Sequence, residues 1–217
     1  LRQAITHPQI LIEGFQRKHK KKFESYNNKS TKINYLIKKI NQYPQDKSII
    51  FCTFRKEIDL IEEALINENI NVATFDGRIS LDKKKEILKK CSHNNNNSYK
   101  YQLINLFNKK NIPQYLTKYI YTLLGGDIKV LIMNIESAAC GLNLQKFNHI
   151  FFTSIHWNPS MELQAIGRAH RIGQEKTVYV EKLLIQDNSE GGRPTIDERI
   201  EEAQTIQLHL IVHRILT

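Results

Sequence analysis

Short apolar runs alternate with amphipathic segments along most of this chain. The runs are rich in β-branched and aromatic residues, and they span residues 48–54, 70–75, 128–134, 149–154 and 177–185. They lack the strict apolar–polar alternation of half-exposed strands, so they are typical of strands that are buried on both faces. The sequence therefore predicts an α/β domain in three layers, with a parallel sheet between two layers of helices.

The segments between these runs have helical periodicity. Apolar residues repeat at helical spacing from residue 33 to residue 40, after Ser30 or Thr31, either of which can cap a helix, and the pattern stops at Pro44. Further helical segments cover residues 55–69, 80–90 and 159 onward. An amphipathic segment from residue 195 predicts a C-terminal helix that packs back on the domain or braces a neighbour.

The composition fits an ordinary globular protein. The chain has 217 residues, of which 41% are hydrophobic and 25% are charged. A chain of this length buries roughly 70% of the surface that its unfolded state exposes, so it can build a real core. No apolar run approaches the ~20 residues of a membrane span, and we expect no membrane association.

The chain is strongly basic, with a formal net charge of +10 and an isoelectric point near 9.4. Clustered lysines and arginines displace the counterions of nucleic acid, so the excess indicates a polyanionic partner. The lysines also accompany abundant Asn and Ile, the residues that A+T-rich codons supply. A nucleic-acid partner and a codon bias therefore both remain open as explanations of the charge.

The three cysteines, Cys52, Cys91 and Cys140, lie far apart and outside any CxxC spacing. This spacing predicts neither a disulfide framework nor a zinc site, and we expect no metal site in this chain. A reducing, intracellular compartment fits such cysteine usage.

The first residues, LRQAITHP, contain no initiator Met and no signal-peptide pattern, so we expect the chain to be part of a longer protein. Residues 16–32 form a basic run, dotted with Asn, that no periodicity organises. Such a run predicts a mobile linker or a solvated arm.

Residues 91–126 interrupt the alternation of strands and helices. The segment contains a run of four asparagines, followed by lysines and the aromatic residues Tyr99, Tyr101, Phe107, Tyr115, Tyr119 and Tyr121. In one interpretation the rings stack on nucleic-acid bases between the lysines. In the other, which the accompanying leucines favour, the rings pack in a small helical insertion with a core of its own.

The segment WNPSMELQAIGRAHRIGQ, residues 157–174, carries polar residues at regular helical spacing. On a helix, Gln164, Arg168 and Arg171 are spaced i, i+4 and i+7 and lie along one stripe. A second, apolar stripe about 100° away contains Ala165, Ala169 and Ile172. The pattern predicts that the apolar stripe packs on the sheet while the polar stripe runs along its rim.

Arginines at such a rim can reach a ligand that another domain holds, because the planar guanidinium matches the geometry of phosphate oxygens. Gly167, which has no side chain, would let that ligand approach closely. Spacing alone also allows a plainer interpretation, namely a helix with two surface arginines and a helix-destabilising glycine.

The wider string is specific enough to resemble a family. WNPSMELQAIGRAHRIGQEKTVYVEKLL is similar to motif VI and its surroundings in the SWI/SNF-like family of superfamily-two helicases, which are ATP-driven DNA translocases. In the same order, LRQAITHP resembles the segment before the second lobe, SIIFCTFRKEIDLIEEAL resembles motif IV, FDGRIS resembles the following turn, and IKVLIMNIESAACGLNL resembles motif V. Motif V departs from the family pattern, because Ala138 and Ala139 stand where glycines are usual.

The resemblance implies that residues 30–190 form a C-terminal RecA-like lobe of the P-loop NTPase fold, with residues 91–126 as an insertion. Residues 1–29 would link this lobe to a missing first lobe, and residues 191–217 would form a C-terminal bracing helix. The chain contains no GxxxxGK[ST] loop and no acidic pair for Mg²⁺. We therefore expect ATP and Mg²⁺ to lie between the lobes, the metal ligands to come from the first lobe, and this chain alone to hydrolyse no ATP.

The resemblance also implies roles for single residues. Arg168 and Arg171 would act as arginine fingers on the transferring γ-phosphoryl group, and Gln164 would orient them or the nucleotide. The other candidates on the nucleotide side are Gly141 and Asn143 of motif V, which would couple the nucleotide to the grip on DNA, and Gly167. The candidates for the DNA-facing surface are Thr53, Arg55, Trp157 and Asn158. Plainer roles remain open, since Trp157 could anchor a helix-entry turn and Thr53 and Asn143 could be local caps.

The function that these expectations describe is DNA-stimulated ATP hydrolysis coupled to movement along double-stranded DNA. The partners would be the first lobe of the same protein and, further, nucleosomes or other DNA-bound proteins, in the nucleus or in a viral or host DNA compartment. A non-catalytic module that docks nucleic acid or a protein is the competing hypothesis, which the alanines of motif V and the insertion favour. The complete glutamine and arginine set opposes it, and the AHRIGQ ending disfavours an RNA helicase.

Overall fold

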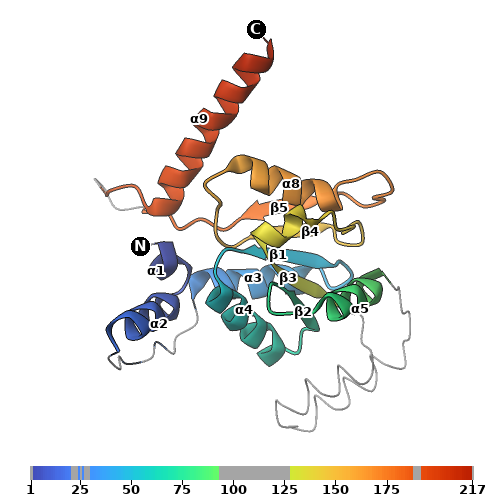
Figure 1. Ribbon diagram of the computed structural model, residues 1–217, viewed down its shortest axis with the longest axis horizontal. Coiled ribbons are helices and arrows are strands. Elements are labelled where there is room, and N and C mark those ends of the chain that lie inside the picture. Colours follow the sequence, from blue (N-terminus) through green and yellow to red (C-terminus); the bar gives the residue numbers. More distant parts are fainter. Residues whose placement is uncertain are drawn as a thin grey trace.

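The computed structural model describes residues 2–20, 24, 26, 30–92, 128–187 and 192–216 of the chain. A five-stranded sheet lies at its centre, and all its strand pairs are parallel (Figure 1). The strand order is β2-β3-β1-β4-β5, with β1 (Ser48–Cys52), β2 (Val72–Phe75), β3 (Val130–Asn134), β4 (His149–Phe152) and β5 (Tyr179–Lys182). The predicted parallel sheet is confirmed, and the predicted strand at residues 177–185 is a short edge strand.

The strands are in register, which gives the sheet two well-defined edges. Ser48 pairs with both Val130 and His149, and His149 pairs with Tyr179. The first residues of the strands therefore line one edge, which we call the amino edge. Their last residues line the opposite edge, the carboxyl edge, where the loops that lead into helices begin.

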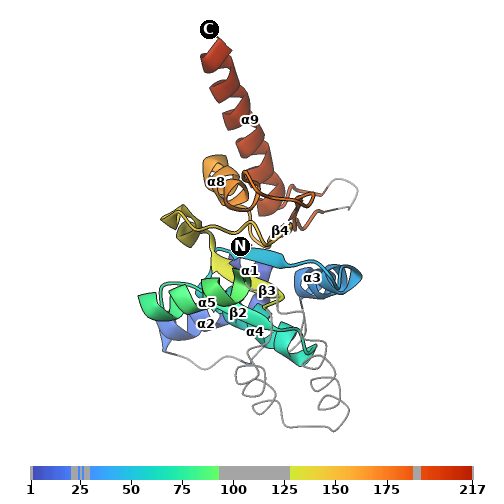
Figure 2. The same ribbon diagram turned by 90° about the vertical axis from the view of Figure 1, so that its right-hand side faces the viewer.

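Helices cover both faces of the sheet. The chain contains α1 (Arg2–Thr6), α2 (Pro8–His19), α3 (Thr31–Gln42), α4 (Arg55–Asn67), α5 (Leu81–Ser92), the 3₁₀ helix η1 (Ile135–Cys140), α8 (Pro159–Ala169) and α9 (Ile196–Leu216). α3 and α4 lie on one face, while α5, η1 and α8 lie on the other (Figure 2). This arrangement confirms the three predicted layers.

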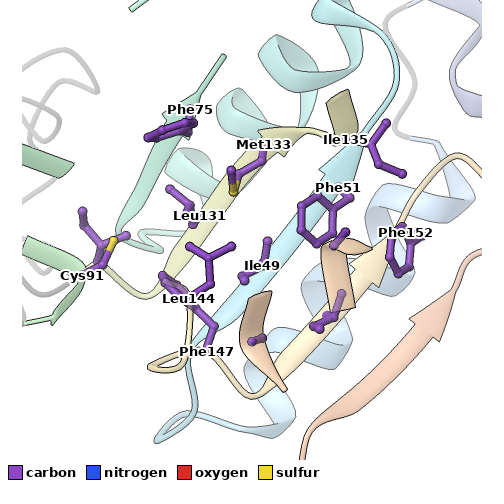
Figure 3. Close-up of a cluster of buried hydrophobic side chains, with 14 residues drawn as sticks. Ile49, Phe51, Phe75, Cys91, Leu131, Met133, Ile135, Leu144, Phe147 and Phe152 are labelled. Atoms are coloured by element: carbon purple, nitrogen blue, oxygen red, sulfur yellow. The ribbon is translucent and has the colours of Figure 1, made fainter. Parts of the chain in front are cut away.

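Each central strand sends alternate side chains into two separate cores. On β1, Ile50 and Cys52 pack against α3 and α4, whereas Ile49 and Phe51 pack on the side of α5 and α8. Figure 3 shows this second core, in which Leu144 and other residues from the loop before β4 join the strand side chains. Burial of each large apolar side chain contributes roughly 1.5–3 kcal/mol, so the two cores hold the layers together.

Local signals account for the boundaries of α3. The Ser30 hydroxyl accepts a hydrogen bond from the N–H of Ile33 at 3.3 Å, and the helix ends at Gln42, two residues before Pro44. Its apolar positions Ile33, Leu36, Ile37 and Ile40 are buried. The predicted cap, periodicity and stop are confirmed.

The basic run at residues 16–32 differs from the predicted linker or arm. α2 continues to His19 and α3 begins at Thr31, so both ends of the run are helical. α2 forms because Pro8 occupies its first turn and His7 caps it, with Nδ1 accepting the N–H of Gln9 at 3.1 Å. Both signals precede the run, which explains why its own periodicity does not reveal the helix.

Residues 93–126, which make up most of the predicted insertion, lie outside the described residues. Within the described part of the chain, every helix is too short or too polar to cross a bilayer. Nowhere among the described residues do three His, Cys, Asp or Glu side chains gather closely enough to hold a metal ion.

Candidate functional site

Two turns at the carboxyl edge hold the predicted DNA-facing residues. Thr53 directly follows β1 and Arg55 begins α4, and the Arg55 side chain is exposed. Trp157 and Asn158 lie in the turn between β4 and α8, where Trp157 is 50% exposed. Because β1 and β4 are neighbours in the sheet, the two turns lie side by side.

A buried carboxylate joins these two turns. Glu57, which is 1% exposed, accepts the N–H groups of Thr53 and Phe54 through Oε2 at 3.1 and 3.2 Å. Its Oε1 accepts the hydroxyls of Thr153 and Ser154 at 2.5 and 2.9 Å. Burial raises the pKa of Glu57, and the hydrogen bonds from Thr153 and the other donors partly oppose that rise. Both turns are therefore fixed to one acceptor group.

The sequence interpretation missed Glu57, although a signal was present. A glutamate at the third position of a helix is the usual partner of the cap backbone, and Glu57 stands at that position of α4. Its second pair of hydrogen bonds, to residues 96 and 97 positions away, had no local signal.

Thr53 does not act as a local cap, which was the plainer role open to it. Its N–H donates to Glu57 and its carbonyl accepts Asn134 Nδ2 at 3.3 Å. Its hydroxyl is buried and has no hydrogen-bond partner among the described residues. The main chain of Thr53 is thus well held, while its hydroxyl makes no local bond.

A second buried carboxylate fixes the turn that carries Trp157. Glu162 of α8 is 2% exposed, and its Oε1 accepts the N–H of His156 at 2.8 Å and Nε2 of Gln204 at 3.0 Å. Its other oxygen lies 2.7 Å from Nζ of Lys182. Asn158 caps α8, because its Oδ1 accepts the N–H of Ser160 at 3.0 Å. Trp157 is therefore a half-exposed side chain on a rigid turn and is not a core residue.

A buried ion pair attaches α3 and α9 to the same edge. Nζ of Lys32 donates to Oδ2 of Asp197 at 2.7 Å and to the carbonyl of Thr153 at 3.0 Å, and both charged side chains are at most 4% exposed. Oδ2 of Asp197 also accepts the N–H of Ile185 at 3.1 Å. Since these bonds satisfy the charges, the pair can stay buried in place.

The predicted nucleotide-facing residues lie along α8 and the loop beside it. The N–H of Leu144 donates to the carbonyl of Arg168 at 3.0 Å, so this loop joins the last turn of α8. Gln164 and Gly167 are exposed and the Arg168 side chain is half-buried. A Cβ on Gly167 would meet no atom of the described residues within 4 Å, so no internal contact explains its missing side chain. The surface over Gly167 is open.

The loop after η1 turns at Gly141, which has a φ of +69° that favours glycine. Ala138 and Ala139 fall within the residue range of the 3₁₀ helix η1. Asn143 is exposed and its Oδ1 accepts the N–H of Gln145 at 3.2 Å, which makes it a local cap.

The predicted polar stripe is wrong at Arg171. α8 ends at Ala169, and the backbone of His170 leaves the helical region with a ψ of 84°. Arg171 is therefore exposed in the turn after the helix, one step beyond the row formed by Gln164 and Arg168. The apolar stripe is confirmed at its helical positions, since Ala169 is 0% exposed, but Ile172 is 98% exposed.

Gln174 explains why the helix ends there. Its Nε2 donates to the carbonyls of Gln145, Phe147 and Ala169 at 2.8, 3.2 and 3.3 Å. Gly173 completes the turn with a φ of +96°, and the N–H of Gln174 donates to the carbonyl of Arg171 at 3.0 Å. The turn that carries Arg171 is thus held on the loop before β4. Gln174 is a second residue that the sequence interpretation missed.

The structure divides the predicted site residues between two places. α8 runs antiparallel to the strands, from the carboxyl edge toward the amino edge, over roughly 16 Å. The first place, at the carboxyl edge, holds Thr53, Arg55, Trp157 and Asn158. The second, along α8 and its neighbouring loop, holds Gly141, Asn143, Gln164, Gly167, Arg168 and, just beyond the helix, Arg171.

Residues 31–107 and 109–173 match the helicase conserved C-terminal domain family. This chain belongs to that family. The motifs' prediction of a SWI/SNF-like helicase C-terminal lobe is thereby confirmed.

Several curated relatives share the helicase C-terminal domain. The chain is 30% identical over 174 residues to the DNA repair protein rad8 of Schizosaccharomyces pombe, an alignment that covers 78% of this chain and 13% of that protein. It is 29% identical to the DNA repair protein RAD5 of Yarrowia lipolytica, over 75% of this chain and 13% of that protein. It is 25% identical to transcription termination factor 2 of Drosophila melanogaster, over 83% of this chain and 14% of that protein. The chain thus spans only a small part of the relatives that it matches.

A solved structure has the same fold. The C-terminal part of the Fun30 ATPase domain superposes with a TM-score of 0.61, over 91% of this chain and 53% of that one, at 21% identity. The RecA-like fold predicted for the helicase C-terminal lobe is therefore confirmed.

Proposed function

We propose that this chain is the C-terminal lobe of an ATP-dependent DNA translocase of SWI/SNF type. In this proposal it supplies arginine fingers to an ATP site that it shares with an N-terminal lobe of the same protein, and it contacts duplex DNA through its carboxyl edge. The observation that carries the proposal is the row of Gln164 and Arg168 on α8, with Arg171 in the turn just beyond the helix, beside the open surface over Gly167.

The second place on the lobe suits a phosphate group. Guanidinium groups bind phosphate oxygens through a planar fork, and the surface over Gly167 leaves room for a ligand. Arg168 is anchored in the last turn of α8, and Arg171 sits in a turn that Gln174 fixes. The backbone at both arginines is therefore held in place, which favours the preorganised charge that electrostatic stabilisation of a transition state requires.

In the proposed mechanism, ATP is the substrate and Mg²⁺ is held by residues of the partner lobe. Arg168 and Arg171 stabilise the charge on the γ-phosphoryl group as it is transferred to water, and Gln164 orients the phosphate or the arginines. Arginine fingers in other NTPases accelerate the reaction by about 10³ to 10⁵. Gly141 and Asn143, in the loop that contacts α8, couple the nucleotide state to the hold on DNA.

The carboxyl edge is the proposed surface for DNA. Thr53, Arg55, Trp157 and Asn158 contact the backbone of the duplex, and such contacts carry no sequence information. Opening and closing of the two lobes then moves the protein along DNA. Residues 30–190 form the lobe and α9 braces the partner lobe. Nucleosomes or other DNA-bound proteins are further partners, in the nucleus or a viral or host DNA compartment.

The test joins this chain to its nucleotide-binding lobe and measures DNA-stimulated ATP hydrolysis. Arg168→Ala and Arg171→Ala should each lower kcat by about 10³ or more, while ATP binding changes little. Arg199→Ala, which removes an exposed arginine of α9, is the matched control and should leave kcat unchanged. Near-normal kcat in both finger variants, with the fold intact, would reject the assignment. Absence of turnover in the unmodified protein together with tight DNA binding would favour the non-catalytic module.

A further inference from the structure

The last turn of α2 forms a cationic surface outside the proposed DNA contacts. Arg17, Lys18, His19 and Lys20 follow one another there, and all four are exposed. Among the described residues, no carboxylate pairs with Lys18 or Lys20. The single acid of α2, Glu13, is itself paired with Lys56 at 2.8 Å. Glu13 also lies near Arg17 and offsets part of its charge, so the charge of the turn that no described carboxylate pairs with is that of Lys18 and Lys20.

α2 is anchored beside the carboxyl edge. Its Glu13 contacts Lys56 in the first turn of α4, next to Arg55. The preceding helix α1 is held by Thr6, whose hydroxyl lies 3.1 Å from that of Ser154, at the end of β4. Figure 1 shows α1 and α2 next to α4, on the side of the molecule where α8 begins. The cationic turn thus continues the surface that carries the proposed DNA contacts.

The charge exceeds what the helix itself requires. A cation in the last turn is stabilised by the helix dipole by about 0.3–1 kcal/mol, and one or two suffice for that. Lys20, moreover, occupies the left-handed position after the helix, with a φ of 51°, where glycine is the usual and cheaper residue. A lysine at that position costs roughly 1 kcal/mol in backbone strain. An external anion would account for keeping a lysine there.

Duplex DNA is the anion that matches this surface in extent. DNA presents one negative charge per ~1.7 Å of its axis, and the four residues of the turn span roughly 6 Å, which corresponds to about two base pairs. Phe15, which is 46% exposed, stacks on His19 with ring centroids 5.7 Å apart and so fixes that ring at the helix end. The side chains of the turn are therefore presented along one short stretch, as backbone contacts require.

We propose that the last turn of α2 is an additional contact for the phosphate backbone of duplex DNA, one that lengthens the binding surface beyond Thr53, Arg55, Trp157 and Asn158. The inference rests on the proposed DNA-binding function of the lobe. It adds affinity without adding sequence preference, because the contacting groups are lysine and arginine ends that reach phosphates only.

The test measures the affinity of the full 217-residue chain for a duplex of arbitrary sequence, of about 30 base pairs, over a range of salt concentrations. The double variant Lys18→Ala/Lys20→Ala keeps a Cβ at both positions, so the backbone strain is unchanged. We expect the slope of log K against log salt to become shallower by about 2, and the affinity at low salt to fall about tenfold, equally on unrelated sequences.

The matched control is Lys83→Ala/Lys85→Ala, which removes two exposed lysines from α5, on the opposite side of the molecule (Figure 1). Its slope should equal that of the unmodified chain. An unchanged slope in the α2 variant, or an equal loss in the α5 control, would overturn this inference and leave the proposed function standing. Failure of the unmodified chain to bind duplex DNA would overturn both.

Discussion

Two acidic side chains at opposite edges of the sheet, Glu57 and Asp46, lie in opposite settings. At the carboxyl edge, Glu57 is buried and forms no ion pair with any described residue, and burial raises its pKa. At the amino edge, burial likewise raises the pKa of Asp46, but hydrogen bonds from Lys176, Asn148 and His149 outweigh it and lower the pKa from 3.8 to about 2. Glu57 therefore serves as a hydrogen-bond acceptor for two turns, whereas Asp46 serves as the anion of an ion-pair cluster.

This contrast teaches that a carboxylate can fix neighbouring segments in two ways, as an acceptor of buried hydrogen bonds or as the anion of an ion-pair cluster. The two turns that carry the proposed DNA contacts are joined at Glu57 by buried hydrogen bonds, which salt does not screen. The amino edge depends on partly exposed charges, since Lys176 lies 2.6 Å from Asp46 with a side chain that is 54% exposed. Such a pair is weakened by salt and by acid.

Glu57→Ala would break the carboxyl edge and should have the largest effect. The change leaves two N–H groups and two hydroxyls without their buried acceptor, so the free energy of unfolding should fall by roughly 3 kcal/mol. Urea unfolding measures it. Glu57→Gln should cost much less, because its amide oxygen accepts the N–H groups and the hydroxyls can reorient toward its NH₂. An exposed control on the same helix, Glu63→Ala, should be neutral, and a similar neutrality in Glu57→Ala would contradict the role.

Asp46→Asn would break the amino edge, and its effect should depend on pH. The folded pKa of Asp46 is below its ordinary value, so its ionised form stabilises the fold above pH 3.8, and this stability is lost as the pH falls toward 2. After allowance for solvent screening, the substitution should cost about 1.5 kcal/mol at pH 7. Unfolding free energies at pH 7 and near pH 2 test this. An equal gap between the two proteins at both pH values would contradict the ion-pair interpretation.

The pH response of the carboxyl edge should have the opposite sign. The folded pKa of Glu57 is raised above 4.5, so its contribution is complete below that pH and is lost as the pH rises through the folded pKa. The difference in unfolding free energy between the unmodified chain and Glu57→Gln should therefore shrink with rising pH. In the comparison with Asp46→Asn, the difference in unfolding free energy should instead grow as the pH rises from about 2 through 3.8. Parallel pH profiles for the two variants would remove the contrast between the edges.

Gln174→Ala should have a smaller effect, about 1 kcal/mol, because the lost group is a neutral amide and the carbonyl of Ala169 still accepts the N–H of Arg171. Gln207→Ala, an exposed glutamine of α9, is the matched control and should be neutral in the same urea unfolding series. Since Gln174 holds the turn of Arg171, the variant should also lose kcat in the two-lobe protein with an unchanged KM for ATP. A loss of stability without any change in kcat would mean that Arg171 does not depend on this turn.

Ile172→Ser should have the smallest effect. The side chain is 98% exposed, so the unfolding free energy should change by less than about 0.5 kcal/mol. The apolar stripe predicted from the sequence would instead place Ile172 in the core, where loss of such a side chain costs about 2–5 kcal/mol. Thermal unfolding of the variant distinguishes the two cases. A loss of about 2 kcal/mol or more in unfolding free energy would mean that Ile172 is buried, as the predicted apolar stripe requires.

How well each element could be predicted from the sequence depends on how far apart along the chain the contacts that determine it lie. The sheet, α3 and the start of α8 were predictable because their signals are local, as in the Ser30 cap and the Asn158–Pro159 turn. The end of α8 was not, because it depends on Gln174 bonds to carbonyls 27 and 29 positions away. Lys32 shows the same limit. It belongs to a basic run that indicates a solvated arm, yet it is 5% exposed and paired with a carboxylate 165 positions away.

Within the candidate site, the family motifs predicted residues that the structure places at or near the surface, but they did not predict the residues that hold the neighbouring turns. The glutamine, the first arginine and the glycines occupy an open flank, where the motif predicted them. Glu57 and Glu162 hold the neighbouring turns from within, through bonds that only the assembled sheet creates. Spacing along a chain cannot show such bonds, because their partners meet only after the strands have paired.

The Lys32–Asp197 pair also sets an order for folding. Closing a contact between residues 165 positions apart has a high entropic barrier, so α9 docks late, after the sheet and α3 have formed. Until then, the ammonium of Lys32 has no carboxylate at its site and must remain hydrated, which keeps that corner of the lobe loose. Docking of α9 brings the carboxylate of Asp197 to Lys32, so the last helix of the chain completes the binding site of a lysine near its beginning.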